Sequence, residues 1–167
     1  DVAPTDALPP LEQLEKFHLP PGFEIQLVVS EADIGQPMNL NFDVRGRLWV
    51  SHSVEYPYPA KGDGVQPRGR FKGTGDHPPR DRLTVLEGIG PNGKPAKITH
   101  FADGLNIPIG QTPIGDGSAA LGYSIPGIFQ LTDKDDDGIA DDRQLLYGKF
   151  GNVDTHGMAN SFTRWID

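Results

Sequence analysis

Residues 128–146 read IFQLTDKDDDGIADDRQLL, which is two apolar segments joined by an acidic turn. The turn follows the pattern D-x-D-x-D-G-x-x-D from Asp133 to Asp141. It places carboxylates at loop positions 1, 3, 5 and 9, a glycine at position 6 and a backbone carbonyl at position 7. This is the oxygen-rich set that Ca²⁺ prefers. We therefore predict a calcium site whose ligands are Asp133, Asp135, Asp137, the carbonyl of Ile139, and Asp141.

The residues around this loop separate it from an EF-hand. Loop position 12 is Gln144 instead of a bidentate Glu, and residues 143–147 predict a strand where an EF-hand has a helix. Asp141 is therefore the expected bidentate ligand. The alternative is a solvated acidic turn, because Asp and Gly dominate turns for reasons unrelated to metals. Six aspartates and one lysine within residues 133–142 would repel one another without a cation, which favours the calcium site.

A matching pattern lies 45 residues upstream of this hairpin. The upstream copy keeps the apolar positions and the turn glycine but lacks the acidic positions. A repeat of about 45 residues that consists of strands and turns is typical of β-propeller blades. With this offset the apolar and glycine positions that align are Leu83 with Ile128, Leu86 with Leu131, Gly93 with Gly138 and Phe101 with Leu146. The positions that align with aspartates are Gly88 with Asp133, Asn92 with Asp137 and Ala96 with Asp141.

A second hairpin signal is the run DVRGRLWV at residues 43–50. The strand after the turn would place Leu48 and Val50 on one face of a sheet and Trp49 on the other. Hairpins of this kind recur in propeller blades. Residues 55–80 then interrupt the pattern with Tyr, Pro, Gly and basic residues. A loop of this length either covers one end of the fold or is disordered.

The amino-terminal region carries one helix signal and one strand signal. Leu11, Leu14 and Phe17 fall at helical spacing after a proline, which predicts a short helix over residues 10–17 whose apolar face covers a sheet. Apolar and polar residues alternate over residues 23–29, which predicts a strand.

Together these signals predict an all-β fold, a partial β-propeller of about two to three blades with a short amino-terminal helix. Residues 1–22 would form the lead and the helix, and residues 23–167 the propeller fragment. Propellers close with about four to eight blades. The remaining blades would therefore come from the same precursor or from another chain. The blades in this chain would span residues 38–103 and 105–149, with a third beginning at 156.

Composition narrows the class of protein further. The chain has 167 residues, 21 Gly, 16 Pro, no Cys and a net charge of −8, which suits a loop-rich β protein. The acidic charge argues against nucleic acid as a partner. Without Cys, this chain has no disulfide, no Cys-ligated zinc and no covalent haem attachment. It contains no transmembrane run. A start at Asp1 without Met, and a loop suited to calcium-rich surroundings, lead us to expect export to the periplasm or the cell surface.

A series of motifs resembles the amino-terminal propeller of a family of large exported planctomycete and verrucomicrobial proteins described as membrane-bound dehydrogenases. Members of that family often carry a haem-binding C-x-x-C-H domain, so the resemblance implies a cytochrome-type partner domain. That propeller is in turn similar to soluble quinoprotein sugar dehydrogenases, which implies a PQQ-like quinone or a haem supplied by parts outside this chain. The motifs occupy residues 20–23, 43–50, 101–106, 125–126, 133–141 and 154–165.

The resemblance places a candidate catalytic base at His156. In the quinoprotein dehydrogenases a propeller histidine accepts the proton of the sugar hydroxyl as hydride moves to the quinone. Histidine suits this role because its pKa lies near working pH, and Asp154 could orient the ring. The alternative is that Asp154 and His156 only hold a turn between blades.

Two function classes therefore remain open, and whether the chain is an enzyme is undecided at this point. The first is a calcium-binding propeller segment of an exported dehydrogenase that oxidises a sugar or an alcohol and passes electrons to a quinone or haem. The second is a non-catalytic, calcium-stabilised binding or scaffold module within a larger assembly that contains haem.

Overall fold

The computed structural model of the protein describes residues 6–62 and 77–164. Part of the predicted long loop, residues 63–76, and the last three residues of the chain lie outside this description. In chain order the elements are α1 (Pro10–Leu14), α2 (Glu31–Ile34), β1 (Pro37–Phe42), β2 (Leu48–His52), β3 (Asp81–Glu87), β4 (Lys97–Leu105), β5 (Gln111–Ile114), β6 (Ala119–Ser124), β7 (Gly127–Thr132) and β8 (Asp142–Gly148).

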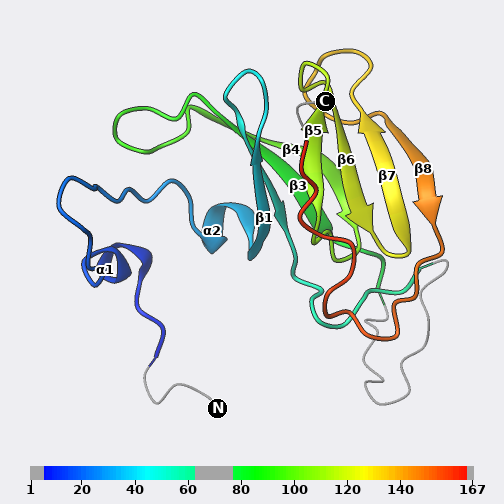
Figure 1. The fold of residues 1–167 in the computed structure, drawn as a ribbon, viewed down its shortest axis with the longest axis horizontal. Coiled ribbons are helices and arrows are strands. Elements are labelled where there is room, and N and C mark those ends of the chain that lie inside the picture. Colours follow the sequence, from blue (N-terminus) through cyan, green and yellow to red (C-terminus); the bar gives the residue numbers. More distant parts are fainter. Residues whose placement is uncertain (1–5, 63–76, 165–167) are drawn as a thin grey trace.

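The strands form two four-stranded antiparallel sheets, in the orders β1-β2-β3-β4 and β5-β6-β7-β8 (Figure 1). Each strand pairs with the next one along the chain, so each sheet is an up-and-down meander. The innermost strands of the two sheets, β1 and β5, lie next to each other. Consecutive four-stranded meanders that pack side by side are the arrangement of propeller blades. The predicted fold class, an all-β partial propeller, is confirmed.

The 45-residue repeat is visible in the strand boundaries. β3 ends at Glu87 and β7 at Thr132, while β4 begins at Lys97 and β8 at Asp142, and each pair of positions is 45 residues apart. The pairing of β3 with β4 also has an irregularity between residues 83 and 84, and that of β7 with β8 between 128 and 129. The two sheets therefore share their strand register as well as their topology.

The main apolar core lies between the sheets. Trp49 is fully buried and meets Phe101 edge to face, with ring centroids 4.7 Å apart. Ala120 and Leu131 of the second sheet complete this cluster. Val50, on the opposite face of β2, belongs to a different cluster, as the predicted alternation requires. Truncation of a buried aromatic of this size typically costs about 3–5 kcal/mol.

The outer face of the first sheet is covered by the chain before β1, and here the predicted strand over residues 23–29 is wrong. Val28 and Val29 pack with Ile34 of α2 against the face of the sheet. Because the segment lies across a face and not along an edge, its backbone has no ladder to join. The short helix α2 was not predicted, although Ser30 N donates to Asp33 Oδ2 at 2.9 Å in the capping pattern that begins it.

The amino-terminal helix is shorter than predicted. α1 ends at Leu14, and none of its residues is buried, so its apolar side does not close on the sheet. An apolar groove of about 820 Å³ lies between residues such as Leu14 and Phe17 and the sheet residues Leu40 and Val50. Among the described residues, no helix is both long and apolar enough to span a membrane. Residues 149–164 contain no strand, so the predicted third blade stays a prediction.

Candidate metal centre and candidate catalytic pair

The acidic loop is the connection between β7 and β8, residues 133–141. Antiparallel pairing brings its two ends together, because Asp141 N donates to Thr132 O at 2.9 Å. The loop is also tied to the neighbouring hairpin, since Asp133 N donates to Ser118 O at 2.9 Å. Residues nine positions apart in the sequence, Thr132 and Asp141, therefore meet at one end of the second sheet.

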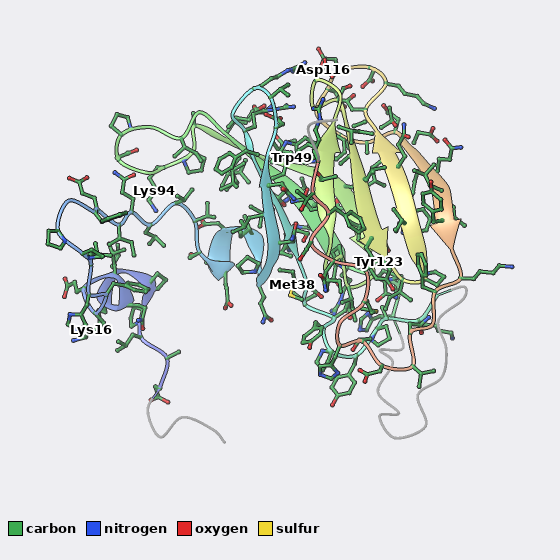
Figure 2. All side chains as sticks on the ribbon, in the orientation of Figure 1. Lys16, Met38, Trp49, Lys94, Asp116 and Tyr123 are labelled. Carbon is green, nitrogen blue, oxygen red and sulfur yellow. The ribbon has the colours of Figure 1, made fainter. Side chains whose placement is uncertain are left out.

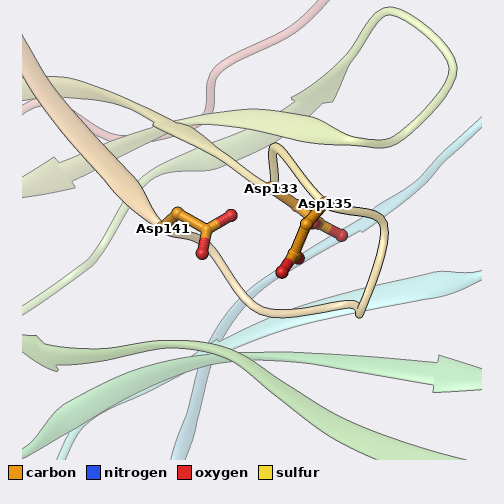
Figure 3. Close-up of side chains that lie close together, drawn as sticks. All are labelled: Asp133, Asp135 and Asp141. Atoms are coloured by element: carbon orange, nitrogen blue, oxygen red, sulfur yellow. The ribbon is translucent and has the colours of Figure 1, made fainter.

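Three of the five predicted ligands come together in this loop. Oxygen atoms of Asp133, Asp135 and Asp141 all lie within 4.8 Å of one another. Figure 3 shows the carboxylate of Asp141 directed towards those of the other two. Asp133 is buried, whereas Asp135 and Asp141 are exposed, so an ion could enter from solvent and rest against a buried ligand. Three carboxylates at this separation could hold a divalent cation.

Backbone N–H groups fix two of these carboxylates. Asp133 accepts from Asp136 N and from Gly138 N, both at 2.8 Å, through its two oxygens. Asp141 Oδ2 accepts from Lys134 N at 2.8 Å. Because a carboxylate oxygen has two lone pairs, each of these oxygens can still coordinate a cation. The loop thus preorganises its acidic groups through its own backbone.

Asp137 and Ile139, the other two predicted ligands, are outside this group of three. The side chain of Asp137 is used in the turn, where Oδ1 accepts from Ile139 N at 2.7 Å. Its charge nevertheless acts on the site. The neighbouring charges of Asp137 and Asp141 raise the pKa of Asp135 above its ordinary value. A bound cation would remove this repulsion.

The same loop contacts the first sheet. Ala140 N donates to Phe101 O of β4 at 2.7 Å, and the Ala140 side chain packs against the core between the sheets. A cavity of about 130 Å³ separates the loop from basic residues of the first sheet, among them Arg47 and Lys97. Arg47 is itself paired with Glu87 at 3.1 Å. The acidic loop therefore forms part of the contact between the two sheets.

The candidate catalytic pair lies in the segment that follows β8. Asp154 Oδ1 and His156 Nδ1 are 2.6 Å apart, and the two side chains are 77% and 68% exposed. The imidazole also meets Tyr56 edge to face, with ring centroids 6.0 Å apart. With Nδ1 donating to Asp154, the other ring nitrogen, Nε2, has no protein partner among the described residues. Asp154 is therefore placed to orient the ring, but the role of His156 as a base stays a prediction.

A cavity of about 310 Å³ lies beside this pair and is lined by the start of β1, by Tyr56, by Ile109 and by the segment around Asn160. In an antiparallel meander the start of β5 and the end of β8 are both at the end of the sheet opposite the β7–β8 loop. Figure 1 shows the segment after β8 leaving from that opposite end before it passes along β5. The candidate metal centre and the candidate catalytic pair are therefore at opposite ends of the second sheet.

Asp81, which the sequence did not single out, holds the walls of this cavity in place. This carboxylate is fully buried and accepts from Ser53 Oγ, Val54 N and Ile107 N at 2.7–2.8 Å. Burial raises the pKa of Asp81, and these donors oppose the shift. The residue thereby joins the chain before Tyr56 to the chain before Ile109. An Asp followed by Arg at a strand start gives no sequence signal of such burial.

Comparisons with known proteins give one family and one distant structure. The family described as "Domain of unknown function (DUF7133)" matches residues 9–167. The holo form of the PQQ domain of pyranose dehydrogenase from Coprinopsis cinerea is similar in structure, with 16% sequence identity and a TM-score of 0.43. The match covers 71% of this chain and 22% of that one. No curated protein matches the sequence.

Proposed function

We propose that this chain, which belongs to the DUF7133 family, is a calcium-binding segment of a β-propeller. The observation that carries the proposal is the group of three carboxylates, Asp133, Asp135 and Asp141, whose oxygens lie within 4.8 Å of one another. The Ile139 carbonyl and Asp137 would complete the set. The ligands are all oxygens, which suits Ca²⁺, whereas Mg²⁺ prefers to retain its waters. The ion would hold the loop in one conformation against the repulsion of its aspartates.

Calorimetric titration of the EDTA-treated protein with Ca²⁺ tests this proposal. The expected result is binding at one site. Calcium should also raise the free energy of unfolding by about 2.7 kcal/mol when its free concentration is a hundredfold above Kd. Asp135→Asn should weaken binding about tenfold or more, because it removes one charged ligand from the group of three carboxylates.

The matched control is Asp136→Asn in the same loop. Asp136 is outside the group of three and has φ 61°, a conformation that Asn also tolerates. Both variants remove one negative charge, so only a direct ligand should separate them. If calcium binds the two variants equally, the loop is a solvated acidic turn.

We assign the His156–Asp154 pair to a dehydrogenase reaction as the second part of the proposal. What supports it is the 2.6 Å contact of Nδ1 with Asp154, which leaves Nε2 as the proton acceptor for a substrate hydroxyl. The lining of the adjacent cavity contains no Arg or Lys to pair with the carboxylates of a PQQ-like quinone. The chain has no Cys for covalent haem. The lining of this cavity therefore offers no partner for the carboxylates of such a quinone, and the chain offers no covalent attachment for haem, so we place the electron acceptor in another domain or partner, such as a cytochrome-type domain.

Dye-linked dehydrogenase activity with sugars and alcohols, with quinone added, tests this second part. His156→Ala should abolish the activity, and Asp154→Asn should lower it and shift its pH profile. If the native protein binds calcium but does not reduce the dye, the alternative function, a non-catalytic scaffold, is favoured instead. In either case we place the protein outside the cytoplasm, with further blades from the same precursor or another chain completing the ring.

A further inference from the structure

A cavity of about 240 Å³ lies on the outer face of the first sheet, beneath α2 and far from both candidate sites of the second sheet. It is bounded by α2 with Gly35, by the end of β2, by the start of β3 and by β4. Arginine and histidine side chains line it from three of these elements. We call it the basic cavity, and its basic residues are Arg80, Arg82, His52 and His100.

Strand register brings these side chains to one face. His52 pairs directly with Arg82, and Thr84 pairs directly with His100. Directly paired residues share a face of a sheet, and residues two positions apart on one strand share it as well. Gly35 leaves room beside the group, because a Cβ there would lie 3.0 Å from His52 Nδ1. The basic cavity therefore follows from the pairing of β2, β3 and β4.

The two arginines are oriented by carboxylates that lie outside the lining. Arg80 Nε donates to Glu55 Oε1 at 3.0 Å, and Arg82 Nε lies 2.5 Å from Asp103 Oδ1. Both contacts use Nε, so the Nη groups of each guanidinium have no protein partner among the described residues. The two side chains are 57% and 43% exposed, so a ligand from solvent can reach them. A guanidinium held in this way presents fixed N–H donors to an oxyanion.

The two histidines add a further donor. The Thr84 hydroxyl oxygen lies 3.1 Å from His52 Nε2 and 2.9 Å from His100 Nδ1. A hydroxyl has one proton, so it donates to one imidazole and accepts from the other. A neutral imidazole that accepts from Thr84 carries its own proton on its other ring nitrogen. In either arrangement, one of the two rings that line the basic cavity therefore has an N–H that Thr84 does not use.

The charge of the lining favours an anion. Burial, and then the positive charges of His100 and Arg82, lower the pKa of His52 to about 4, which indicates a positive potential at this imidazole. The acidic residue of the lining is Asp33. Its carboxylate accepts from Ser30 N at 2.9 Å and from Ser30 Oγ at 3.2 Å at the start of α2. Two arginines thus outweigh one aspartate in the lining, although Asp33 should weaken anion binding.

From these observations we infer that the basic cavity binds a small tetrahedral oxyanion, of the phosphate or sulfate class, through the Nη groups of Arg80 and Arg82 and one imidazole N–H. Donors on three side chains suit the several oxygens of a tetrahedral ion better than the two oxygens of a carboxylate. The volume is below the range of about 300–1,000 Å³ for larger ligands, which fits a small ion or a single charged head group. The inference depends neither on calcium nor on the dehydrogenase reaction.

Nuclear magnetic resonance of the ¹⁵N-labelled chain tests the inference, with sulfate, phosphate, acetate and glycerol 1-phosphate as probes and chloride at equal ionic strength as the reference. Sulfate and phosphate should shift the amide signals of residues 33–35, 52, 80–82 and 100 with a Kd of about 1 mM or less, and acetate should bind about tenfold more weakly. If glycerol 1-phosphate binds as tightly as phosphate, the ligand is a phosphorylated molecule, and if it binds more weakly, the ligand is the free ion. The inference is overturned if neither tetrahedral ion shifts these signals more than chloride does, or if acetate binds as well as sulfate.

Three variants of opposite expected effect separate a built site from overall charge. Arg82→Gln should weaken sulfate binding about tenfold, because it removes a charged donor. Asp33→Asn should tighten it about threefold, since it removes a negative charge and keeps an oxygen for Ser30. The matched control is Arg45→Gln in the turn before β2, where Arg45 pairs with Asp116 (Figure 2) at 2.8 Å, and it should leave binding unchanged.

The amide spectrum of each variant shows whether the sheets remain folded. Equal weakening in Arg82→Gln and Arg45→Gln would mean that sulfate responds only to the net charge of the chain, which contradicts the assignment of the basic cavity. Weaker sulfate binding in a folded Asp33→Asn would contradict it as well.

Discussion

The connections β3–β4 (residues 88–96) and β7–β8 (residues 133–141) hold the same position in two sheets, and each has nine residues. The first closes through its backbone, with Gly90 N donating to Lys94 O at 3.0 Å. The second also has a backbone bond, from Asp141 N to Thr132 O, but inside the loop it is held by aspartate side chains, with Asp133 accepting from two backbone N–H groups. A hairpin of this length therefore forms without carboxylates. This difference supports the proposal that the aspartates of the second connection bind calcium.

The two connections also differ in what they contact. The first meets the segment before β1, where Gln26 Nε2 donates to Pro91 O at 2.8 Å. The second meets the neighbouring sheet, where Ala140 N donates to Phe101 O at 2.7 Å. Both keep a glycine with positive φ at the equivalent position, 77° at Gly93 and 91° at Gly138. The shared glycine allows the turn in both connections, and the residues that differ determine which part of the chain each connection contacts.

The largest expected effect, the complete loss of calcium binding, comes from changing the second connection towards the first. The triple variant Asp133→Gly, Asp137→Asn, Asp141→Ala gives the β7–β8 loop the residues of its counterpart at these three positions. It should lose calcium binding entirely and destabilise the metal-free protein by about 2 kcal/mol, because backbone donors lose their charged acceptors. Titration calorimetry and urea unfolding measure the two effects. The comparison of the loops fails if calcium still binds, or if circular dichroism shows that the sheet is lost.

A second test uses the turns at the other hairpin of each sheet. Gly46 and Gly117 both have positive φ, 74° and 85°. A Cβ at Gly46 meets nothing within 4 Å, whereas one at Gly117 would overlap the side chains of Arg47 and Asp43. Gly117→Ala should therefore cost about 2–4 kcal/mol, and Gly46→Ala only the backbone strain of about 1–2 kcal/mol. Equal losses in urea unfolding would mean that the contact between the two turns contributes little.

The acidic loop, the segment before β1 and the cavity beside His156 were predictable from the sequence to different degrees. The acidic loop was predictable because its aspartates lie within nine residues, and strand alternation predicted the flanking hairpin. The segment over residues 23–29 was predicted wrongly, since alternation reports one-sided burial and does not tell a sheet edge from a sheet face. The cavity beside His156 was not predictable, because Asn39, Tyr56 and Asn160 converge only through the packing of the two sheets.

Equivalent faces of the two sheets extend the comparison. Thr84 pairs with His100 across the first sheet, and Phe129 pairs with Leu145 at the equivalent position of the second. Within this apolar pair, Phe129 packs on the core between the sheets, whereas Leu145 is exposed. In the first sheet the Thr84 hydroxyl instead lies between two imidazoles, 3.1 Å from His52 Nε2 and 2.9 Å from His100 Nδ1. The first sheet thus has a polar pair on the face that the chain before β1 covers, where the second sheet has an apolar pair.

The buried His52 beside Thr84 predicts that the stability of the protein depends on pH and that this dependence comes from the first sheet. Burial, aided by the neighbouring charges of His100 and Arg82, lowers the pKa of His52 to about 4. In the unfolded chain the pKa is ordinary, near 6.5, so below that pH the unfolded state binds a proton that the folded state does not. Stability should therefore fall as the pH drops, by about 2 kcal/mol between pH 6.5 and pH 5.

Urea unfolding at several pH values measures this slope. His52→Gln retains an amide that can bond Thr84 and should flatten the slope in that window. His18→Gln, at an exposed position before the first sheet, is the control and should leave it unchanged. A slope that persists in His52→Gln would assign the pH dependence to other groups.

The smallest effect is expected at the exposed link between the two sheets. Arg45 and Asp116 connect the same two turns as Arg47 and Gly117, at 2.8 Å, but their side chains are 47% and 62% exposed. Arg45→Ala should cost less than about 0.5 kcal/mol, and salt should remove most of that loss, because solvent screens the pair. Arg47 is largely buried and bonds Asp43, Glu87 and the Gly117 carbonyl, so Arg47→Ala should cost more, and salt should change that loss little. If urea unfolding gives the two variants the same loss, the sheets are held by their apolar core alone, and these turns do not contribute to the contact.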